Sequence, residues 1–217
     1  MKLTKRKLIA RNNRNLIVDS HPDSLIAEQF QTIQSNISLL TPDEGNQVLL
    51  ITSPLKEEGK TTTAVNLAIT LASQKRKVLL IDSNLRKPST HMIFKIPNKV
   101  GLTNVLLGKS SLKEAVTQTE ISKLEVLPSG PTPVNPVELL NSKGMSELLT
   151  TARQIYEIVV IDSPSVLEVT DAKLIANHCD GVILVVNRGK TQLENAREAR
   201  KKLEFAKAKI IGVILNK

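Results

Sequence analysis

Residues 49–68, LLITSPLKEEGKTTTAVNLA, carry the strongest local signal in this chain of 217 residues. An apolar run is followed by a short loop, then by Gly59, Lys60 and Thr61, and then by a segment of helical character. A strand that enters a helix through such a loop directs main-chain N–H groups and the positive end of the helix dipole at one point. This arrangement favours a polyphosphate ligand.

The loop departs from the pattern G-x-x-x-x-G-K-[ST] in two ways. Pro54 stands where the first glycine is expected, and Glu57 and Glu58 add negative charge beside an anionic ligand. Taken alone, EGKT could also begin a helix after an acidic turn. If the loop binds a nucleotide, Lys60 reaches the β and γ phosphates and the Thr61 hydroxyl holds Mg²⁺.

Five short runs rich in Val, Ile and Leu recur along the chain. They are QVLLITS from Gln47, KVLLIDS from Lys77, YEIVVIDS from Tyr156, GVILVVN from Gly181 and KIIGVILNK from Lys209. Each is continuously apolar rather than alternating, which is typical of parallel strands covered on both faces. The segments between them have helical character, among them TTAVNLAITLASQ, GMSELLTTARQ, VTDAKLIANH and TQLENAREARKKLEFA. This alternation predicts a doubly wound α/β fold with a mostly parallel sheet and helices on both faces.

Two regions interrupt the alternation. SLIAEQFQTIQSNISLL from Ser24 has apolar residues at helical spacing, with Asp23 or Ser24 as a cap, and predicts an amphipathic helix against the domain or a neighbouring subunit. Residues 84–154 contain the turn-rich stretch SGPTPVNP, whose prolines exclude helix, and we expect this insertion to form part of the wall beside the site. We interpret residues 1–20 as a flexible basic arm and residues 21–217 as one domain.

Two aspartates end apolar strands downstream of the loop. Asp82 closes KVLLIDS and Asp162 closes VVIDS, and the carboxyl ends of parallel strands share one edge of a sheet. Asp82 can bind Mg²⁺ or polarise an attacking hydroxyl or water, whereas Asp162 stands where an acid holds the metal. A single strand-end aspartate is as often a helix cap, but two of them downstream of GKT favour phosphoryl transfer. We therefore predict Lys60, Asp82 and Asp162 as catalytic residues and Thr61, Asp82 and Asp162 as metal ligands.

The composition limits the classes of function. The formal net charge is +9. We interpret the basic residues either as solvated surface or as a surface that contacts an acidic membrane face or an acidic protein. Aromatic residues make up 2% of the chain and leave almost no platform for base stacking, so nucleic acid is not an expected partner. One cysteine, Cys179, and three scattered histidines indicate no disulfide and no His/Cys metal site. No apolar run is long enough to span a membrane and the N-terminus lacks a signal-peptide core, so we expect an intracellular protein.

A series of motifs in a fixed order carries a family resemblance. The series is EGKTTTAVNLA, LLIDSNLRKP, GLTNVLLG, SGPTPVNPVELL, IVVIDSP, TDA and GVILNK. It resembles the cytoplasmic domain of bacterial tyrosine kinases of the capsule and exopolysaccharide type, over residues 25 to 217. Those kinases share a P-loop superfamily with the partition (Par) and septum-placement (Min) ATPases. The resemblance implies transfer of the ATP γ-phosphate to tyrosine hydroxyls, with ATP and Mg²⁺ as cofactors.

The resemblance also implies roles for individual residues. Lys60 would cradle phosphate, while Thr61 and Asp162 would hold Mg²⁺. Asp82 would help to activate the tyrosine hydroxyl, and Asn216 would read the adenine edge. The implied cofactor-binding set is Glu58, Gly59, Lys60, Thr61, Thr62 and Asn216. The implied partners are a membrane-anchored adaptor of polysaccharide synthesis and protein tyrosine substrates, with the chain in the cytoplasm and held at the inner face of the membrane through its adaptor.

Some residues at motif positions depart from the family pattern. Lys56 and Glu57 replace a usual proline and glycine, so we expect an effect on nucleotide affinity. Asn84 replaces the second aspartate of the strand-end pair, and an amide cannot accept the substrate proton as a carboxylate can. We therefore expect slow catalysis.

Self-association and autophosphorylation are affected by other departures. The family's early helix carries a glutamate and two arginines that mediate ring assembly, whereas this chain has Glu28, Gln31 and Gln34, which weakens any contact built on the two arginines. A homo-oligomer therefore stays an open alternative. The family usually continues into a tyrosine-rich tail, whereas the only tyrosine here, Tyr156, heads an expected core strand.

Three functions fit these observations. The first is an ATP-dependent protein-tyrosine kinase regulated by a membrane adaptor. The second is a pseudokinase, a nucleotide-binding scaffold of the same machinery, favoured by Glu57 and Asn84. The third is a partition-type ATPase that uses water as the acceptor and ATP to control dimerisation.

Overall fold

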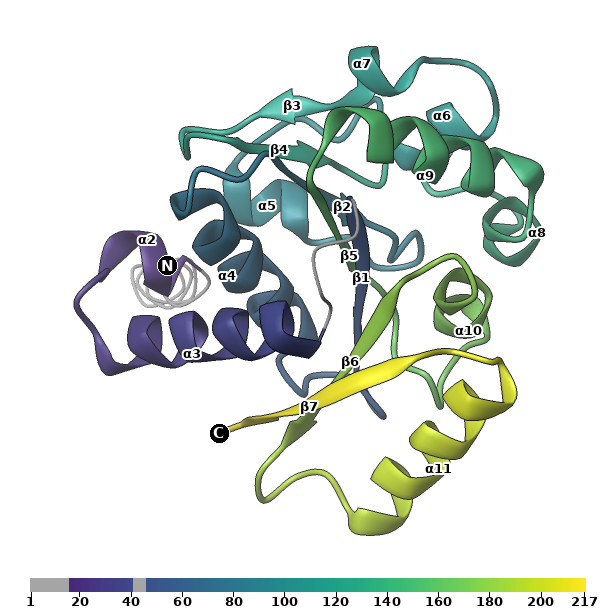
Figure 1. Ribbon diagram of the computed structural model, residues 1–217. Coiled ribbons are helices and arrows are strands. Elements are labelled where there is room, and N and C mark those ends of the chain that lie inside the picture. Colours follow the sequence, from purple (N-terminus) through teal and green to yellow (C-terminus); the bar gives the residue numbers. More distant parts are fainter. Residues whose placement is uncertain (1–15, 41–45) are drawn as a thin grey trace, which may run out of the picture.

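The computed structural model describes residues 16–40 and 46–217, and a mixed sheet forms its centre (Figure 1). The strands in these residues are β1 (Gln47–Thr52), β2 (Val78–Asp82), β3 (Thr117–Gln118), β4 (Leu124–Leu127), β5 (Ile158–Asp162), β6 (Gly181–Asn187) and β7 (Ile210–Asn216). Their order in space is β3-β4-β2-β5-β1-β6-β7, and all neighbouring pairs are parallel except β3 with β4. The predicted doubly wound α/β class is confirmed.

Helices cover both faces of the sheet. They are α2 (Ile17–Ser20), α3 (Leu25–Leu40), α4 (Lys60–Ser73), α5 (Thr90–Phe94), α6 (Leu102–Leu106), α7 (Leu112–Ala115), α8 (Pro136–Leu140), α9 (Lys143–Ile155), α10 (Asp171–Ala176) and α11 (Leu193–Phe205). Helices α2 to α5 pack on one face and α6 to α11 on the other, and Figure 1 shows α3 and α4 on the opposite side of the sheet from α9. None of the helices in the described residues is long and apolar enough to cross a membrane.

The central strands are buried on both faces, which explains their continuously apolar sequences. Along β1, Leu50 joins the core under α6 to α11, whereas Leu49 joins the core under α3 and α4. Helix α4 is buried over most of its length because it lies between the sheet and α3. The first turn of α4 is thereby held rigidly against the carboxyl end of β1.

The strand order brings the two strand-end aspartates together. Strand β5 lies between β1 and β2, and Asp82 and Asp162 are direct partners in the β2–β5 register. The chain passes from β1 over β5 to β2, and later from β5 over β1 to β6. Connections that diverge in this way leave a crevice at the carboxyl ends of the strands, where doubly wound proteins bind ligands.

The insertion of residues 84–154 contains more regular structure than its sequence predicts. It holds the β3–β4 hairpin, which extends the sheet beside β2, although β3 has two residues and β4 four. Runs this short carry too little periodicity to identify from the sequence. The expectation that the prolines of SGPTPVNP exclude helix is wrong at Pro136, which is the first residue of α8 and follows the Asn135 cap. Proline is tolerated there because the first helical N–H has no partner within the helix.

The predicted flexible arm extends too far along the chain. Residues 1–15 lie outside the described residues, but α2 belongs to the domain, because the Val18 N–H donates to the Asn66 side chain of α4 at 3.1 Å. The predicted helix at residues 24–40 is present as α3, and the Ser24 hydroxyl accepts the Ala27 N–H as a cap. On α3, Gln34 is buried and its side-chain oxygen accepts from Gln74, which follows α4. Gln34 is therefore directed into its own chain.

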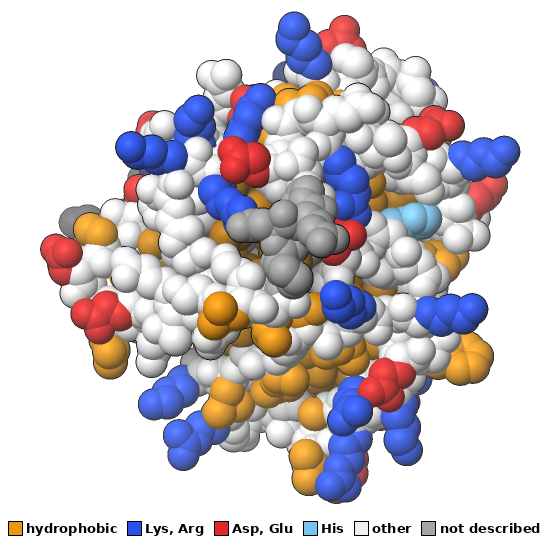
Figure 2. All heavy atoms as spheres, viewed as in Figure 1, with side chains coloured by type: hydrophobic (Ala, Val, Ile, Leu, Met, Phe, Trp, Pro, Cys, Tyr) orange, Lys and Arg blue, Asp and Glu red, His pale blue; other side chains and the backbone are white. Residues whose placement is uncertain are grey.

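Strand β7 is at the edge of the sheet and has an exposed apolar face. Val213 and Leu215 are 60% and 62% exposed, and a hollow of about 160 Å³ lies between this strand and the end of α3 near Leu40. Figure 2 shows hydrophobic side chains gathered here, between α3 and α11, with Lys and Arg on either side.

Candidate active site

The phosphate loop, residues 53–59, joins β1 to α4 and depends on unusual backbone conformations. Gly59 has φ +91° and Glu57 has φ +61°, both in the left-handed region. A Cβ built on Gly59 would lie 2.1 Å from the Asn216 side-chain nitrogen, so only glycine fits there. Glu57 occupies a conformation that favours glycine, which explains why a glycine is usual at that position.

Lys60 and Thr61 form the first turn of α4, directly after this loop. The start of the 14-residue helix directs main-chain N–H groups and its positive dipole end at the crevice. The Thr61 hydroxyl donates to Asp162 Oδ2 at 2.7 Å, so α4 and β5 meet at this contact. The structure thus brings together three of the predicted residues: the lysine, the hydroxyl and the carboxylate.

Asp162 is fully buried and incompletely hydrogen-bonded. Its Oδ1 has no hydrogen-bond partner among the described residues. The pKa of Asp162 is raised to about 7, and burial is the largest cause. The charge of Lys60 lowers this pKa and the charge of Asp82 raises it, while the hydrogen bond from Thr61 lowers it. An ionised carboxylate at this position therefore requires additional positive charge.

These groups fit Mg²⁺. The described residues contain no cluster of three or more His, Cys, Asp or Glu side chains that could hold a metal on their own. Mg²⁺ bound with a nucleotide uses only one or two protein oxygens and completes its shell with phosphate oxygens and water. The orphaned Asp162 Oδ1 and the adjacent Thr61 hydroxyl are such a pair of oxygens.

Asp82 serves as a cap in this structure. Its Oδ2 accepts from the N–H groups of Ser89 and Thr90 and from the Thr90 hydroxyl, at 2.9 to 3.0 Å. Among the described residues, its Oδ1 accepts the Asn84 N–H alone, at 3.1 Å. Burial raises the pKa of Asp82, and these hydrogen bonds oppose the rise. Asp82 fixes the start of α5, and Oδ1 retains acceptor capacity.

Other predicted cofactor-binding residues lie in or against the loop. The Glu58 side chain is buried and engaged within the protein: it accepts from the Leu55 N–H at 2.7 Å and from the Thr191 hydroxyl. Only its main chain is therefore available to a phosphate. The Asn216 side chain donates to the Glu58 carbonyl at 3.0 Å, so the end of β7 lies on the loop. Thr62 follows Thr61 in the first turn of α4.

Sequence reasoning missed two neighbours of the loop. The Lys190 ammonium lies 3.4 Å from the carbonyl oxygens of Lys56 and Glu57 and 3.3 Å from the Glu57 carboxylate. Thr191 contacts Glu58, as above. Both follow β6, so the rule that carboxyl ends of parallel strands share one edge could have identified them.

A further missed contact joins the two aspartate loops. Arg86, four residues after Asp82, makes a two-pronged ion pair with buried Asp171, at 3.0 and 3.2 Å. Asp171 lies at the start of α10, after Asp162 and its loop. This pair ties part of the 84–154 insertion to the segment that follows β5.

The exposed Glu57 carboxylate is expected to weaken nucleotide binding. Replacing it by Gln removes a negative charge beside the phosphates, and we expect ATP·Mg²⁺ affinity to rise about twofold to fivefold, the range of an exposed charge–charge interaction. Calorimetry at low and high salt measures the effect, which should shrink at high salt. Glu57→Gly serves as the matched variant that also relieves the backbone. An unchanged affinity in Glu57→Gln at low salt would show that this charge is irrelevant.

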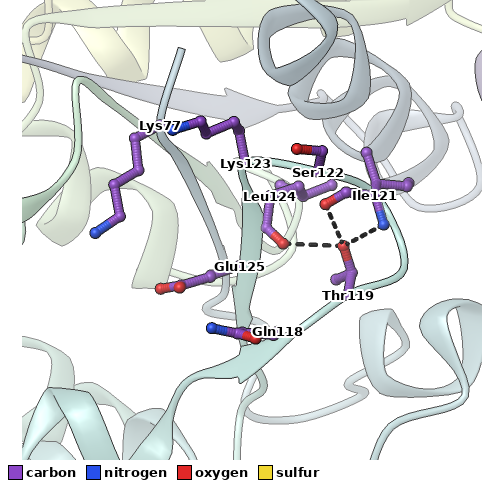
Figure 3. A pocket seen from close by; sticks show the side chains of 8 residues that line it. All are labelled: Lys77, Gln118, Thr119, Ile121, Ser122, Lys123, Leu124 and Glu125. Carbon is purple, nitrogen blue, oxygen red and sulfur yellow. Dashed lines mark hydrogen bonds between the residues drawn. The ribbon is translucent and has the colours of Figure 1, made fainter. Parts of the chain in front are cut away.

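A hollow at the opposite end of the sheet is not part of this site. It has a volume of about 260 Å³ and lies beside the β3–β4 hairpin (Figure 3). The Thr119 hydroxyl contacts main-chain groups of Ile121 and Leu124 (Figure 3), and Glu125 accepts from the Tyr156 hydroxyl. The side chains of Thr119 and Glu125 are thus used for structure.

Tyr156, the only tyrosine in the sequence, is 2% exposed. Burial raises the pKa of its hydroxyl, and the hydrogen bond to Glu125 raises it further. Lys77 lies over the ring, 5.0 Å from its centre. The expected position of Tyr156 in the core agrees with this buried environment, which keeps the hydroxyl away from any phosphate donor.

The comparisons with known proteins agree with this geometry. Residues 57–210 match the family described as an AAA domain. The tyrosine-protein kinase YwqD of Bacillus subtilis (strain 168) is 46% identical over 207 residues, which are 95% of this chain and 87% of that protein. The putative tyrosine-protein kinase CapB of Staphylococcus aureus is 36% identical over 202 residues, 93% of this chain and 89% of that protein.

Solved structures give the same result. The chimerical protein CapA2B2 has a TM-score of 0.89 and 40% identity, over 93% of this chain and 89% of that chain. The septum site-determining protein MinD of Pyrococcus horikoshii OT3, complexed with Mg-ADP, has a TM-score of 0.68 and 26% identity, over 78% of this chain and 70% of that chain. With its phosphate loop, paired strand-end aspartates and these relatives, the chain belongs to the bacterial tyrosine-protein kinase family of P-loop proteins.

Proposed function

We propose that this protein is an ATP-dependent protein-tyrosine kinase that transfers the γ-phosphate to tyrosine hydroxyls of proteins and regulates capsule or exopolysaccharide synthesis. The observation that carries the proposal is the contact between Thr61 and Asp162, with an orphaned carboxylate oxygen, beside Lys60 and the start of α4. Relatives named tyrosine-protein kinases, which this chain matches over most of their length, support the same activity.

Each residue has a defined part in this proposal. Loop N–H groups and Lys60 bind and orient the β and γ phosphates. Thr61 and Asp162 would hold Mg²⁺, which when bound would neutralise charge on the phosphate oxygens. As the tyrosine oxygen bonds to the γ-phosphorus and ADP leaves, the phenolic proton needs an acceptor, and we assign it to Asp82 Oδ1, which carries a single hydrogen bond.

The proposed partners follow from the same activity. Tyr156 is buried, so it is not proposed as the acceptor tyrosine. A membrane-anchored adaptor of polysaccharide synthesis, as in related kinases, would hold the protein in the cytoplasm at the inner face of the membrane. Self-association is a separate proposal. Gln34 stands where the family pattern has an arginine, and its side chain accepts a hydrogen bond from Gln74 of the same chain.

A nucleotide-binding scaffold is the second candidate. It is favoured by Asn84, which cannot accept a proton, and by the occupation of Asp82 Oδ2 in capping α5. A scaffold would bind ATP·Mg²⁺ without phosphorylating tyrosine. The two candidates therefore differ in phosphate transfer and not in nucleotide binding.

The test is incubation with ATP, Mg²⁺, an adaptor cytoplasmic segment and a tyrosine-containing acceptor peptide. We expect phosphotyrosine on the peptide that is absent with the Lys60→Met variant. Transfer that is undetectable although ATP·Mg²⁺ binds would favour the scaffold. ATP hydrolysis without any phosphotyrosine, accompanied by ATP-dependent dimers, would favour a partition-type ATPase.

Restoring a carboxylate at residue 84 should raise the transfer rate. In Asn84→Asp we expect kcat to increase about tenfold or more, because general-base catalysis contributes about 10²–10⁴-fold where it operates. The Asn84 side-chain oxygen accepts the Lys87 N–H at 3.2 Å, a contact that aspartate can keep. Asn84→Ser, also a short polar side chain, is the control. Equal rates in all three proteins would mean that no proton passes through this position.

A further inference from the structure

The loop between β6 and α11, residues 188–192, contacts the phosphate loop through two side chains. The Thr191 hydroxyl donates to Glu58, and the Lys190 ammonium lies against the carbonyl oxygens of Lys56 and Glu57. Lys190 and Glu57 are both well exposed, so their ion pair adds little. The Thr191 contact is different because its acceptor is buried.

Glu58 is a fully buried carboxylate in the phosphate loop. Such a group is stable only when its oxygens are hydrogen-bonded. One oxygen accepts the Leu55 N–H at 2.7 Å and the other accepts the Thr191 hydroxyl. Among the described residues each oxygen thus accepts one hydrogen bond, and loss of the Thr191 hydroxyl would remove the bond to one of them.

The hydroxyl of Thr191 is itself oriented. Its oxygen accepts the Asn187 N–H at 2.8 Å, and its proton is directed at Glu58. A chain of hydrogen bonds therefore runs from the end of β6, through Thr191 and Glu58, to the main chain at Leu55. Groups connected in this way polarise and rigidify one another.

The main chain next to Glu58 is the part of the loop that would face a bound phosphate. Gly59 follows it in the left-handed conformation, and Lys60 begins α4. The Asn216 side chain donates to the Glu58 carbonyl at 3.0 Å, so the Glu58 side chain is held from the loop after β6 and its carbonyl from the end of β7. The orientation of the N–H groups of residues 58–60 depends on both.

We propose that Thr191 is a positioning residue, which holds Glu58 and thereby sets the phosphate loop in its nucleotide-binding geometry. This inference rests on the proposed nucleotide-dependent function. Thr191 touches no phosphate itself and acts through Glu58. Its loss should therefore lower nucleotide affinity while the fold persists.

The test compares Thr191→Val, which keeps the shape without the hydroxyl, with Thr191→Ser, which keeps the hydroxyl. We expect Thr191→Val to raise the Kd for ATP·Mg²⁺ about tenfold to a hundredfold, as for loss of a hydrogen bond to a buried charge, and Thr191→Ser to stay within about threefold of wild type. Calorimetry gives the Kd, and circular dichroism without ligand shows that each variant is folded. Rescue by serine distinguishes positioning from a general loss of packing.

A double variant that combines Thr191→Val with Glu58→Gln measures the coupling between Thr191 and Glu58. If Thr191 acts through Glu58, Thr191→Val should cost clearly less in the Glu58→Gln background than in the wild type. Should Thr191→Val fail to fold, Glu58→Gln and Thr191→Ala measure the same contact.

The outcomes separate the two proposals. Wild-type affinity in Thr191→Val, or equal losses in Thr191→Val and Thr191→Ser, would overturn the positioning role and leave the kinase proposal standing. Binding that depends on Thr191, without any tyrosine phosphorylation, would support the positioning role and overturn the kinase. A wild-type protein that binds no ATP·Mg²⁺ would overturn both.

Discussion

Lys60→Met is expected to weaken ATP·Mg²⁺ binding by about a hundredfold or more and to abolish tyrosine phosphorylation. The ammonium of Lys60 is the positive side chain at the start of α4, in a crevice that also contains buried Asp82 and Asp162. Without it, the phosphates lie near two carboxylates and lose the positive side chain that offsets their charge. Loss of one preorganised donor of this kind costs about 10²–10³ in rate.

Calorimetry and phosphotyrosine detection measure the two effects of Lys60→Met. The matched control is Lys113→Met, which removes an exposed lysine from α7 and should bind ATP·Mg²⁺ as the wild type does. A lower affinity in both variants would point to the net charge of +9 rather than to the loop. If Lys60→Met bound ATP·Mg²⁺ as tightly as the wild type, the nucleotide would bind elsewhere.

Asp162→Asn is expected to lower the rate of phosphate transfer by about a hundredfold, because an amide cannot supply a charged oxygen to Mg²⁺. The amide is nearly isosteric with the carboxyl group, and its oxygen can still accept from Thr61. Titration of activity with Mg²⁺ should show a requirement shifted to higher concentration. A wild-type Mg²⁺ dependence in Asp162→Asn would remove this residue from the metal site.

The same substitution should change how stability depends on pH in the ligand-free protein. Burial raises the pKa of Asp162 to about 7, far above the value of about 3.9 in an unfolded chain. Between these values the folded state binds the extra proton, so the stability contributed by Asp162 is full at low pH and is lost as the pH rises through 7. The raised pKa of Asp82 acts in the same direction in both proteins. Thermal unfolding should show that the stability of Asp162→Asn relative to the wild type is higher at pH 8 than at pH 5.

Much of the fold and part of the site could be predicted because their signals are local. Continuous apolar runs identified β1, β2, β5, β6 and β7, since strands covered on both faces have no polar side to interrupt them. Lys60, Thr61, Asp82 and Asp162 could be placed at one edge because parallel strands end together. The short strands β3 and β4 carry too few residues for such a signal.

The contacts that were not predicted join residues far apart in the sequence. Thr191 and Glu58 are 133 positions apart, and nothing near Glu58 indicates that its carboxylate is buried. From the sequence alone, Glu58 is therefore predicted to place negative charge beside the ligand. Arg86 and Asp171, 85 positions apart, are hidden for the same reason.

The pairing of Asp82 with Asp162 in the β2–β5 register means that the sheet fixes the spacing of these two carboxylates in the active site. Their spacing is set by main-chain hydrogen bonds along the whole ladder, so no single side chain tunes it. Inserting one residue into either strand would turn one carboxylate to the other face of the sheet. Attempts to engineer the strength of metal binding should therefore leave these strands intact and alter the loops beyond their carboxyl ends.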